Sequence, residues 1–295
     1  MKSAVAIFTL SSSLSSVLAA SYSRSENIVG AGFYNAFKFE AISDLTHGRL
    51  DSRVNYVDKV TAQSQNLTFA TRDTFILRAD SKTVISDSSS VGRNSVRIRS
   101  NNAYTTVQDV FRFDIVHRPQ GCGWETNEAT WPAGGGVDII EGVNDHGPNQ
   151  ITLHTNPGCT MSNRVQTGTT LLTDCDVNIA GNSGCGVNVG TPPSFGPTSL
   201  PLAVDGMYAI ERTPAFISVW FWPRAAGNVP ADVRAGGAAV NTGNWRGVPA
   251  ANFSNTNCNM NQFFSAHNII INLTFCGDWA EPNFSTCPTT CSAVS

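Results

Sequence analysis

Short runs in which apolar and polar side chains alternate dominate this sequence, and segments with the period of an α-helix are almost absent. Residues 95–100 and 111–115 show the alternation most clearly. A period of two places every second side chain on the same face, so each run predicts a strand with one face in water. Further candidate strands lie at 74–78, 137–141, 150–155, 207–212, 216–222 and 269–275.

Turn-forming residues separate these runs and limit how they can be connected. Gly, Pro, Asn and Asp cluster between the candidate strands, and the 295 residues include 25 glycines and 14 prolines. Many short strands joined by such turns favour one antiparallel sandwich, so we expect an all-β protein. Trp220 and Trp222 alternate with Val219 and Phe221 in one candidate strand. One face of that strand is predicted to be core, and the assignment of the other stays open.

Charge is scarce in this chain. The 19 Lys and Arg residues against 22 Asp and Glu residues give a net charge of −3, and only 14% of residues are charged. Soluble domains typically have about 25% charged residues. A protein that binds nucleic acid by neutralising phosphates needs a basic surplus, so we expect no nucleic-acid partner. Neutral polar and aromatic surface is typical of sugar binders, and clustered carboxylates in such a chain need an explanation.

The N-terminal segment indicates export. Lys2 precedes an apolar run interrupted by serines, and small residues near Ala19 offer a cleavage site, so residues 1–19 are predicted to be a signal peptide. That run is too short and too polar for a membrane anchor, and no second apolar span of about 18 residues follows. We therefore expect a secreted, extracellular monomer without a membrane partner, in which residues 20–295 form a single domain.

The cysteines and the glycosylation sequons agree with export. An even set of cysteines in an oxidising compartment predicts disulfides, whose pairing stays open. For the last two cysteines, a disulfide is favoured over a metal site. Asn272 begins a sequon that lies inside a strand pattern. The cysteines are Cys122, Cys159, Cys175, Cys185, Cys258, Cys276, Cys287 and Cys291, and the other sequons begin at Asn66, Asn252 and Asn283.

The candidate chemistry is concentrated in residues 131–145. Asp138 and Glu141 are two acids in an apolar strand pattern, and because acids are costly to bury, this position points to function. In a regular strand Gly136 and Asp138 share a face and Glu141 does not, whereas a β-bulge places all three on one face. Positions 136 and 141 then lie roughly 13 Å apart at Cα. Glutamates at both positions would bring their carboxyls near the separation of about 5–5.5 Å in retaining glycosidases.

This segment resembles the active-site strand of the laminarinases in glycoside hydrolase family 16. The resemblance rests on Trp131-Pro132, the following glycine run, residues 137–144 and the segment Thr152-Leu153-His154-Thr155. Similar segments at 47–49, 92–98, 119–123 and 272–279 extend it over nearly the whole mature chain. It implies a concanavalin-like β-jelly-roll sandwich whose concave face binds β-1,3- and mixed-linkage glucans, and an endo-1,3(4)-β-glucanase type of activity.

The resemblance also exposes one substitution. The family motif runs Glu-x-Asp-x-x-Glu, with nucleophile, assisting acid and acid/base residue in that order, and Gly136 stands where the nucleophile belongs. Asp138 and Glu141 are the remaining catalytic residues. Loss of a nucleophile costs a factor on the order of 10⁶ in kcat, or about 8 kcal/mol. The alternatives are therefore an impaired glucanase, a non-catalytic β-glucan-binding protein, or the product of a disrupted gene.

Five further residues are candidates for glucan binding. Trp131 and Trp279 are expected to stack on glucosyl rings, although burial before a proline turn is an alternative for Trp131. His154 is expected to hydrogen-bond the neighbouring acid or the substrate, or to be a structural histidine. Arg97 and Glu211 would contact sugar hydroxyls or form surface ion pairs. We expect no cofactor and no metal.

Two family segments have no counterpart here. About five residues, including a sugar-stacking Trp, are expected after Gly123, and the family's last aromatic strand is expected after Cys291. The domain is therefore predicted to lack its last strand, which would uncover a sheet edge or an apolar face.

Overall fold

The computed structural model describes residues 20–42, 54–86, 92–104, 109–116, 131–143, 146–162, 164–189, 206–245 and 247–276. Strands predominate there, and each candidate strand named above overlaps a strand of the structure, although the observed strands differ in length. The helices are short, and within these ranges none is long and apolar enough to cross a membrane. The predicted all-β class is confirmed.

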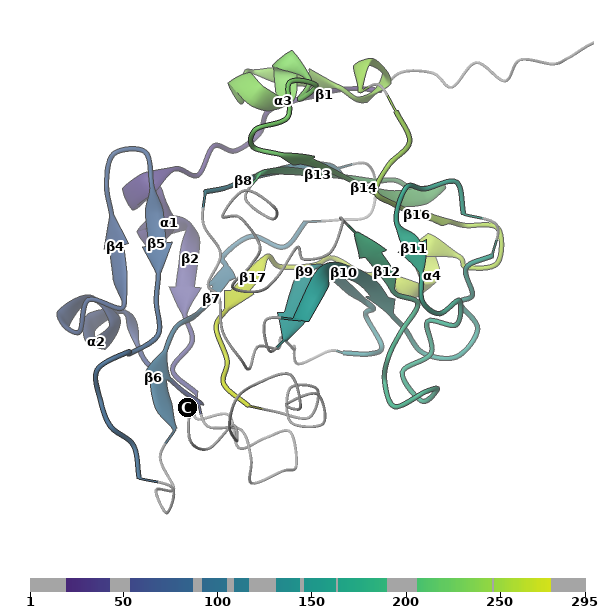
Figure 1. Ribbon diagram of the computed structural model, residues 1–295. Coiled ribbons are helices and arrows are strands. Elements are labelled where there is room, and N and C mark those ends of the chain that lie inside the picture. The colour runs from purple at the N-terminus through teal and green to yellow at the C-terminus, as the bar shows by residue number, and fades with distance from the viewer. Residues whose placement is uncertain are drawn as a thin grey trace, which may run out of the picture.

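Two four-stranded antiparallel sheets face each other (Figure 1). The β9 sheet has the order β11 (Thr169–Thr170), β12 (Val187–Val189), β10 (His146–His154) and β9 (Gly136–Val143). The β13 sheet has the order β16 (Ala251–Ser254), β14 (Phe216–Pro223), β13 (Gly206–Arg212) and β8 (Asp109–Ile115). This arrangement confirms the predicted sandwich.

The main hydrophobic core lies between these two sheets. Ile151 and Leu153 of β10 pack with Ile210, Val219 and Phe253 of the β13 sheet, and none of the five is more than 4% exposed. Full burial of each such side chain stabilises the fold by about 1.5–3 kcal/mol. Because side chains alternate along a strand, the even-numbered residues of β10 point to the outer face of the β9 sheet.

A second core covers the outer face of the β13 sheet. Trp220 and Trp222 of β14 pack edge to face against Trp245, with ring centroids 5.1 and 5.9 Å apart. Val233 of α3 (Ala231–Ala235) belongs to this cluster, and β1 (Ser21–Ser23) pairs with β15 (Ala239–Asn241) beside it. Both faces of β14 are therefore core, which settles the face that the sequence left open.

A third core lies beside the sandwich, at the left of Figure 1. It unites Phe37, Ala62, Leu67, Val96 and Ile98, all at most 5% exposed. The elements around it are α1 (Phe33–Ala36), β2 (Phe37–Phe39), β3 (Val54–Tyr56), α2 (Lys59–Ser64), β4 (Thr68–Ala70), β5 (Phe75–Leu77), β6 (Arg93–Ser95), β7 (Arg97–Ser100) and β17 (Ile270–Asn272). The other elements are 3-10 turns at Gly30–Gly32 and Thr242–Asn244 and α4 (Met260–Phe263).

Two disulfides lock the loops around β10 and β12. Cys159 joins Cys258 across 99 residues, and Cys175 joins Cys185 across 10 residues. In the chain-entropy account a bridge across about 100 residues contributes nearly 5 kcal/mol. None of the described cysteines is free, which confirms the expected disulfides for this part of the chain. Cys276 is also disulfide-bonded, and Cys122, Cys287 and Cys291 lie outside the described residues.

Candidate functional site

A β-bulge in β9 brings the candidate acids to one face. The paired positions across β9 and β10 are Gly136 with His154, Asp138 with Thr152, and Glu141 with Gln150. Between the second and third pairs, β9 advances by three residues and β10 by two. The extra residue is a bulge, and the three β9 positions therefore share the outer face of the sheet. Of the two alternatives that the sequence left open for this strand, the register shows the bulged one.

Asn149 holds this bulge in place. Its Nδ2 donates a hydrogen bond to the carbonyl oxygen of Ile139 at 2.9 Å, and the backbone N–H of Glu141 donates to its Oδ1 at 3.1 Å. These are backbone groups next to the break in the β9–β10 ladder, and the asparagine is only 1% exposed. Asn149 is not among the residues predicted from the sequence. The pattern that could have revealed it is its position two residues before Ile151 and four before Leu153, which puts a polar amide on the core face of the strand.

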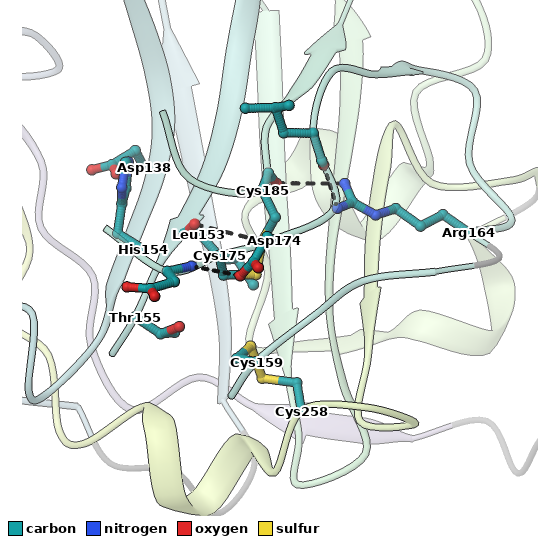
Figure 2. Close-up of a disulfide and its surroundings, with 12 residues drawn as sticks. Asp138, Leu153, His154, Thr155, Cys159, Arg164, Asp174, Cys175, Cys185 and Cys258 are labelled. Carbon is teal, nitrogen blue, oxygen red and sulfur yellow. Dashed lines mark hydrogen bonds and ion pairs between the residues drawn. A yellow bond between two sulfur atoms is a disulfide. The ribbon is translucent and has the colours of Figure 1, made fainter. Parts of the chain in front are cut away.

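Asp138 and His154 lie side by side at the centre of this face (Figure 2). Asp138 Oδ2 is 3.4 Å from His154 Nε2, and the two side chains are 22% and 11% exposed, respectively. The Nδ1 of His154 is buried and has no partner. A proton on Nε2 points to Asp138, and Nδ1 then carries only a lone pair without a donor. The tautomer with its proton on Nε2 is therefore favoured. His154 therefore contacts the neighbouring acid, as one of the sequence-based alternatives expected.

A second polar group of the same face is also unpaired. The Oγ1 of Thr152, opposite Asp138, is buried without a hydrogen-bond partner. Leaving a buried polar group unpaired costs about 1–3 kcal/mol. Unpaired buried groups are rare in native folds, and two on one strand face beside two acids mark a face that is not arranged for stability alone.

Trp131 packs directly against Gly136. A Cβ placed on Gly136 would lie 3.2 Å from Trp131 Nε1, 3.3 Å from its Cδ1 and 3.5 Å from His154 Cβ. A larger residue at position 136 therefore requires the indole to shift by a few tenths of an ångström. Trp131 is partly buried, and its ring centroid is 6.0 Å from that of His154. The indole thus borders the site at Gly136.

The Cys175–Cys185 loop covers the other side of His154 (Figure 2). The backbone N–H of Cys185 donates to the carbonyl oxygen of Leu153 at 3.0 Å. Gly184 has a φ of +60°, and a Cβ there would lie 2.6 Å from that carbonyl oxygen and 2.8 Å from His154 Cε1. Only glycine fits this approach, so the disulfide-bonded loop limits where the imidazole can lie.

Three side chains of this face have the spacing of a cation site. One donor atom each from Asp138, Glu141 and His154 lie within 4.8 Å of one another, and no other such group occurs among the described residues. Two carboxylates and an imidazole could hold a divalent cation. The same groups also suit acid–base chemistry, so the spacing assigns no metal.

The remaining predicted residues lie elsewhere or are not described. Arg97 of β7 donates from Nε to Glu40 Oε2 at 2.8 Å and is 6% exposed. It therefore forms an ion pair, which was the predicted alternative to sugar binding, but the arginine is buried and not at the surface. Trp279 lies outside the described residues.

Glu211 lies away from the candidate site, so the prediction that it contacts sugar hydroxyls there is wrong. Its Oε1 accepts hydrogen bonds from Tyr22 at 2.7 Å and Thr242 at 3.0 Å. Burial, followed by the hydrogen bond to Glu211 and the negative charge of that residue, raises the pKa of Tyr22 well above its ordinary value. Glu211 lies in phase with Ala209, on the face of β13 that points away from the β9 sheet. The whole sandwich therefore separates it from Asp138, and it is not part of the candidate site.

Comparison with known families and structures identifies clear relatives. A family model described as "XgeA-like, catalytic GH16 domain" matches residues 37–295. The solved GH16 laminarinase 16A of Phanerochaete chrysosporium, with 6-O-glucosyl-laminaritriose in donor and acceptor sites, is 52% identical. The match covers 93% of this chain and 92% of that one, with a TM-score of 0.84. An elongating GH family 16 β-1,3-glucosyltransferase is 32% identical over 93% of this chain and 92% of that one, with a TM-score of 0.79. These matches confirm the predicted jelly roll.

Curated fungal proteins are similar over most of this chain. A probable glycosidase of Schizosaccharomyces pombe is 35% identical over 93% of this chain and 64% of its own length. A probable endo-1,3(4)-β-glucanase of Aspergillus niger is 36% identical over 99% of this chain and 38% of its own length. The chain therefore spans less than two thirds of these relatives.

Proposed function

We propose, since this chain belongs to glycoside hydrolase family 16, that it binds β-1,3(1,4)-glucans on the outer face of the β9 sheet and hydrolyses them with impaired catalysis. The observation that carries the proposal is the bulged strand, which aligns Asp138 and Glu141 with Gly136 on one face. The similar laminarinase holds glucan oligosaccharides, which supports a β-glucan as the partner here.

Each residue of the face has a distinct role in this proposal. Glu141 protonates the glycosidic oxygen of the leaving sugar as the acid/base residue. Asp138, held by His154, assists it. Trp131 stacks against a glucosyl ring with its open face. Gly136 supplies no carboxylate, so no covalent glycosyl intermediate forms at this position. A water molecule attacks the anomeric carbon directly and loses its proton to bulk water, and the expected loss is on the order of 10⁶ in kcat.

Restoring the carboxylate tests this proposal. Laminarin hydrolysis is measured as released reducing ends for the wild type, Gly136→Glu and Gly136→Ala. The alanine variant is the matched control, because it adds the same Cβ against Trp131 without a carboxylate. We expect the glutamate variant to be faster than both by several orders of magnitude. A folded Gly136→Glu protein as slow as the alanine variant would refute the assigned positions.

A second candidate function is β-glucan binding without any turnover. It is favoured by the contact between Trp131 and Gly136, because the indole occupies space in which water or an anion would replace the missing carboxylate. Calorimetry with laminari-oligosaccharides distinguishes the two functions when combined with the hydrolysis assay. Binding with no reducing ends at any enzyme loading supports this candidate, and no binding contradicts both.

The same proposal places the protein outside the cell. The predicted signal peptide and the paired state of the described cysteines support an oxidising compartment. Asn66 is an exposed sequon residue, whereas Asn272 lies partly buried in β17 and donates to the hydroxyl of Tyr56 at 3.0 Å. Secretion is tested by N-terminal sequencing of protein from culture medium, where a retained residue 1 would contradict cleavage near Ala19.

A further inference from the structure

His267 connects the end of β13 to the turn that begins β9. We propose that His267 is a positioning residue for the candidate site: its neutral side chain ties Arg212 to the turn at Gly134 and Gly135 and thereby sets where Gly136 and Trp131 lie. Its effect on glucan affinity rests on the function proposed above, whereas its effect on the turn does not.

The hydrogen bonds fix one tautomer of His267. Its Nδ1 is 2.7 Å from Arg212 Nη1, and its Nε2 is 3.0 Å from each carbonyl oxygen of Gly134 and Gly135. A guanidinium can only donate, so Nδ1 must be the acceptor. The proton is then on Nε2, which donates to the two carbonyl oxygens. The other neutral tautomer would place two donors together at Arg212 and leave Nε2 facing acceptors.

Arg212 is a firm anchor for this contact. It is 6% exposed, and its Nη2 donates to the carbonyl oxygens of Phe264 and Ser265, each at 2.7 Å. Arg212 ends β13 and is paired with Asp109 of β8. The linkage therefore runs from the β13 sheet through His267 to the first residues of β9, and it crosses between the two sheets.

The turn has little room to move independently. The backbone N–H of Ser265 donates to the carbonyl oxygen of Gly134 at 3.0 Å. Gly135 has a φ of +75°, and a Cβ there would lie 2.4 Å from the carbonyl oxygen of Phe263. Gly136 follows directly and contacts Trp131, so a shift of the turn passes to the site. His267 contacts neither acid, and it acts through the backbone.

The charges around His267 favour its neutral form. Burial lowers the pKa of His267 below its ordinary value of 6.5, the Arg212 guanidinium lowers it further, and the hydrogen bonds to the glycine carbonyls oppose these effects. Asp109 of β8 faces Arg212. Tyr104, which pairs with His267 through the backbone, donates its hydroxyl to Glu26. Protonation of Nδ1 would remove the acceptor for Arg212 and set two cations against each other.

Two substitutions separate the effect of the His267 hydrogen bonds from the effect of its side-chain volume. In His267→Gln the amide can donate to the glycine carbonyls and accept from Arg212, whereas His267→Phe keeps a ring without hydrogen bonds. Laminaripentaose affinity is measured by calorimetry at pH 7.5. We expect His267→Gln to stay within about threefold of wild type and His267→Phe to bind at least tenfold more weakly. Wild-type affinity in His267→Phe, or a loss in His267→Gln as large as that in His267→Phe, would overturn the proposal.

A measurement without ligand keeps the two proposals apart. Nitrogen NMR of ¹⁵N-histidine-labelled protein reports the tautomer, and the His267 signals are those absent from His267→Gln. We expect the Nε2-protonated form at pH 7.5, and an indole resonance of Trp131 that shifts in His267→Phe and not in His267→Gln. A proton on Nδ1, or an indole resonance unchanged in His267→Phe, contradicts the positioning role. If these signals behave as expected and the wild type binds no laminaripentaose, the proposed function fails and the positioning of the turn stands.

Discussion

Replacing Asn149 by leucine is expected to destabilise the fold and release the bulge in β9. The amide is 1% exposed and bonds the N–H of Glu141 and the carbonyl of Ile139. Leucine leaves both backbone groups unpaired, and at about 1–3 kcal/mol each the loss is about 2–6 kcal/mol. For a chain of this size, 3 kcal/mol corresponds to a decrease in Tm of about 6–12 °C.

The functional consequence follows from the side-chain period. If β9 relieves the loss by closing the bulge, Glu141 moves to the other face of the strand, because a shift of one residue inverts the facing of the side chains beyond it. Laminari-oligosaccharide binding measured well below Tm then separates this effect from unfolding. We expect Asn149→Leu to bind more weakly while still folded.

Asn149→Asp is the matched control for this substitution. It keeps an acceptor for the N–H of Glu141 and loses the donor to the carbonyl of Ile139, so its Tm should lie between those of the wild type and the leucine variant. Thermal unfolding followed by circular dichroism measures all three proteins. A leucine variant with wild-type Tm and wild-type glucan affinity would refute the role of the amide in the bulge.

Four other outcomes are expected. The pKa of His267 is lower in the folded state than its ordinary value of 6.5, so below pH 6.5 the unfolded state binds more protons than the folded state. The free energy of unfolding is therefore fully retained above pH 6.5 and falls below it. Urea unfolding at pH 7.5 and 5 should show a smaller fall in His267→Gln than in the wild type. Gly184→Ala should lower Tm, because its Cβ would meet the Leu153 carbonyl oxygen at 2.6 Å; an unchanged Tm contradicts that contact. Glu211→Gln should lower Tm and leave calorimetric glucan affinity unchanged, whereas weaker binding would return Glu211 to the site. With an α-glucosyl fluoride donor, Glu141 should take the proton from an acceptor hydroxyl as fluoride leaves, and chromatography should detect the longer oligosaccharide; fluoride release with hydrolysed sugar alone contradicts this.

The predicted site residues that the structure brings together are those whose signal is local. Asp138 and Glu141 stand out as acids in an apolar run, and of the two alternatives for β9, a regular strand or a bulged one, the register shows the bulge that puts both acids on one face. His154 follows from its place on the adjacent strand. These inferences succeed because strand periodicity relates neighbours in sequence to neighbours in space.

The residues that the sequence placed wrongly or missed depend on distant partners. Glu211 has the same local pattern as a site residue, and only contacts with Tyr22, 189 residues away, show that it serves the outer core. His267 lies 132 and 133 residues from the glycine turn that it holds. No local pattern records such a pairing.

The sequence by itself determined the strands, their two faces and the identity of the acids, because backbone geometry repeats every two residues wherever a strand forms. The tertiary structure alone decided which face of each strand is covered. It placed Trp220 against Trp245 in a second core and Trp131 against Gly136 at the site. Alternation of side chains defines the two faces of a strand but not which residues pack on each face. The packing depends on contacts between buried side chains that are far apart in the chain.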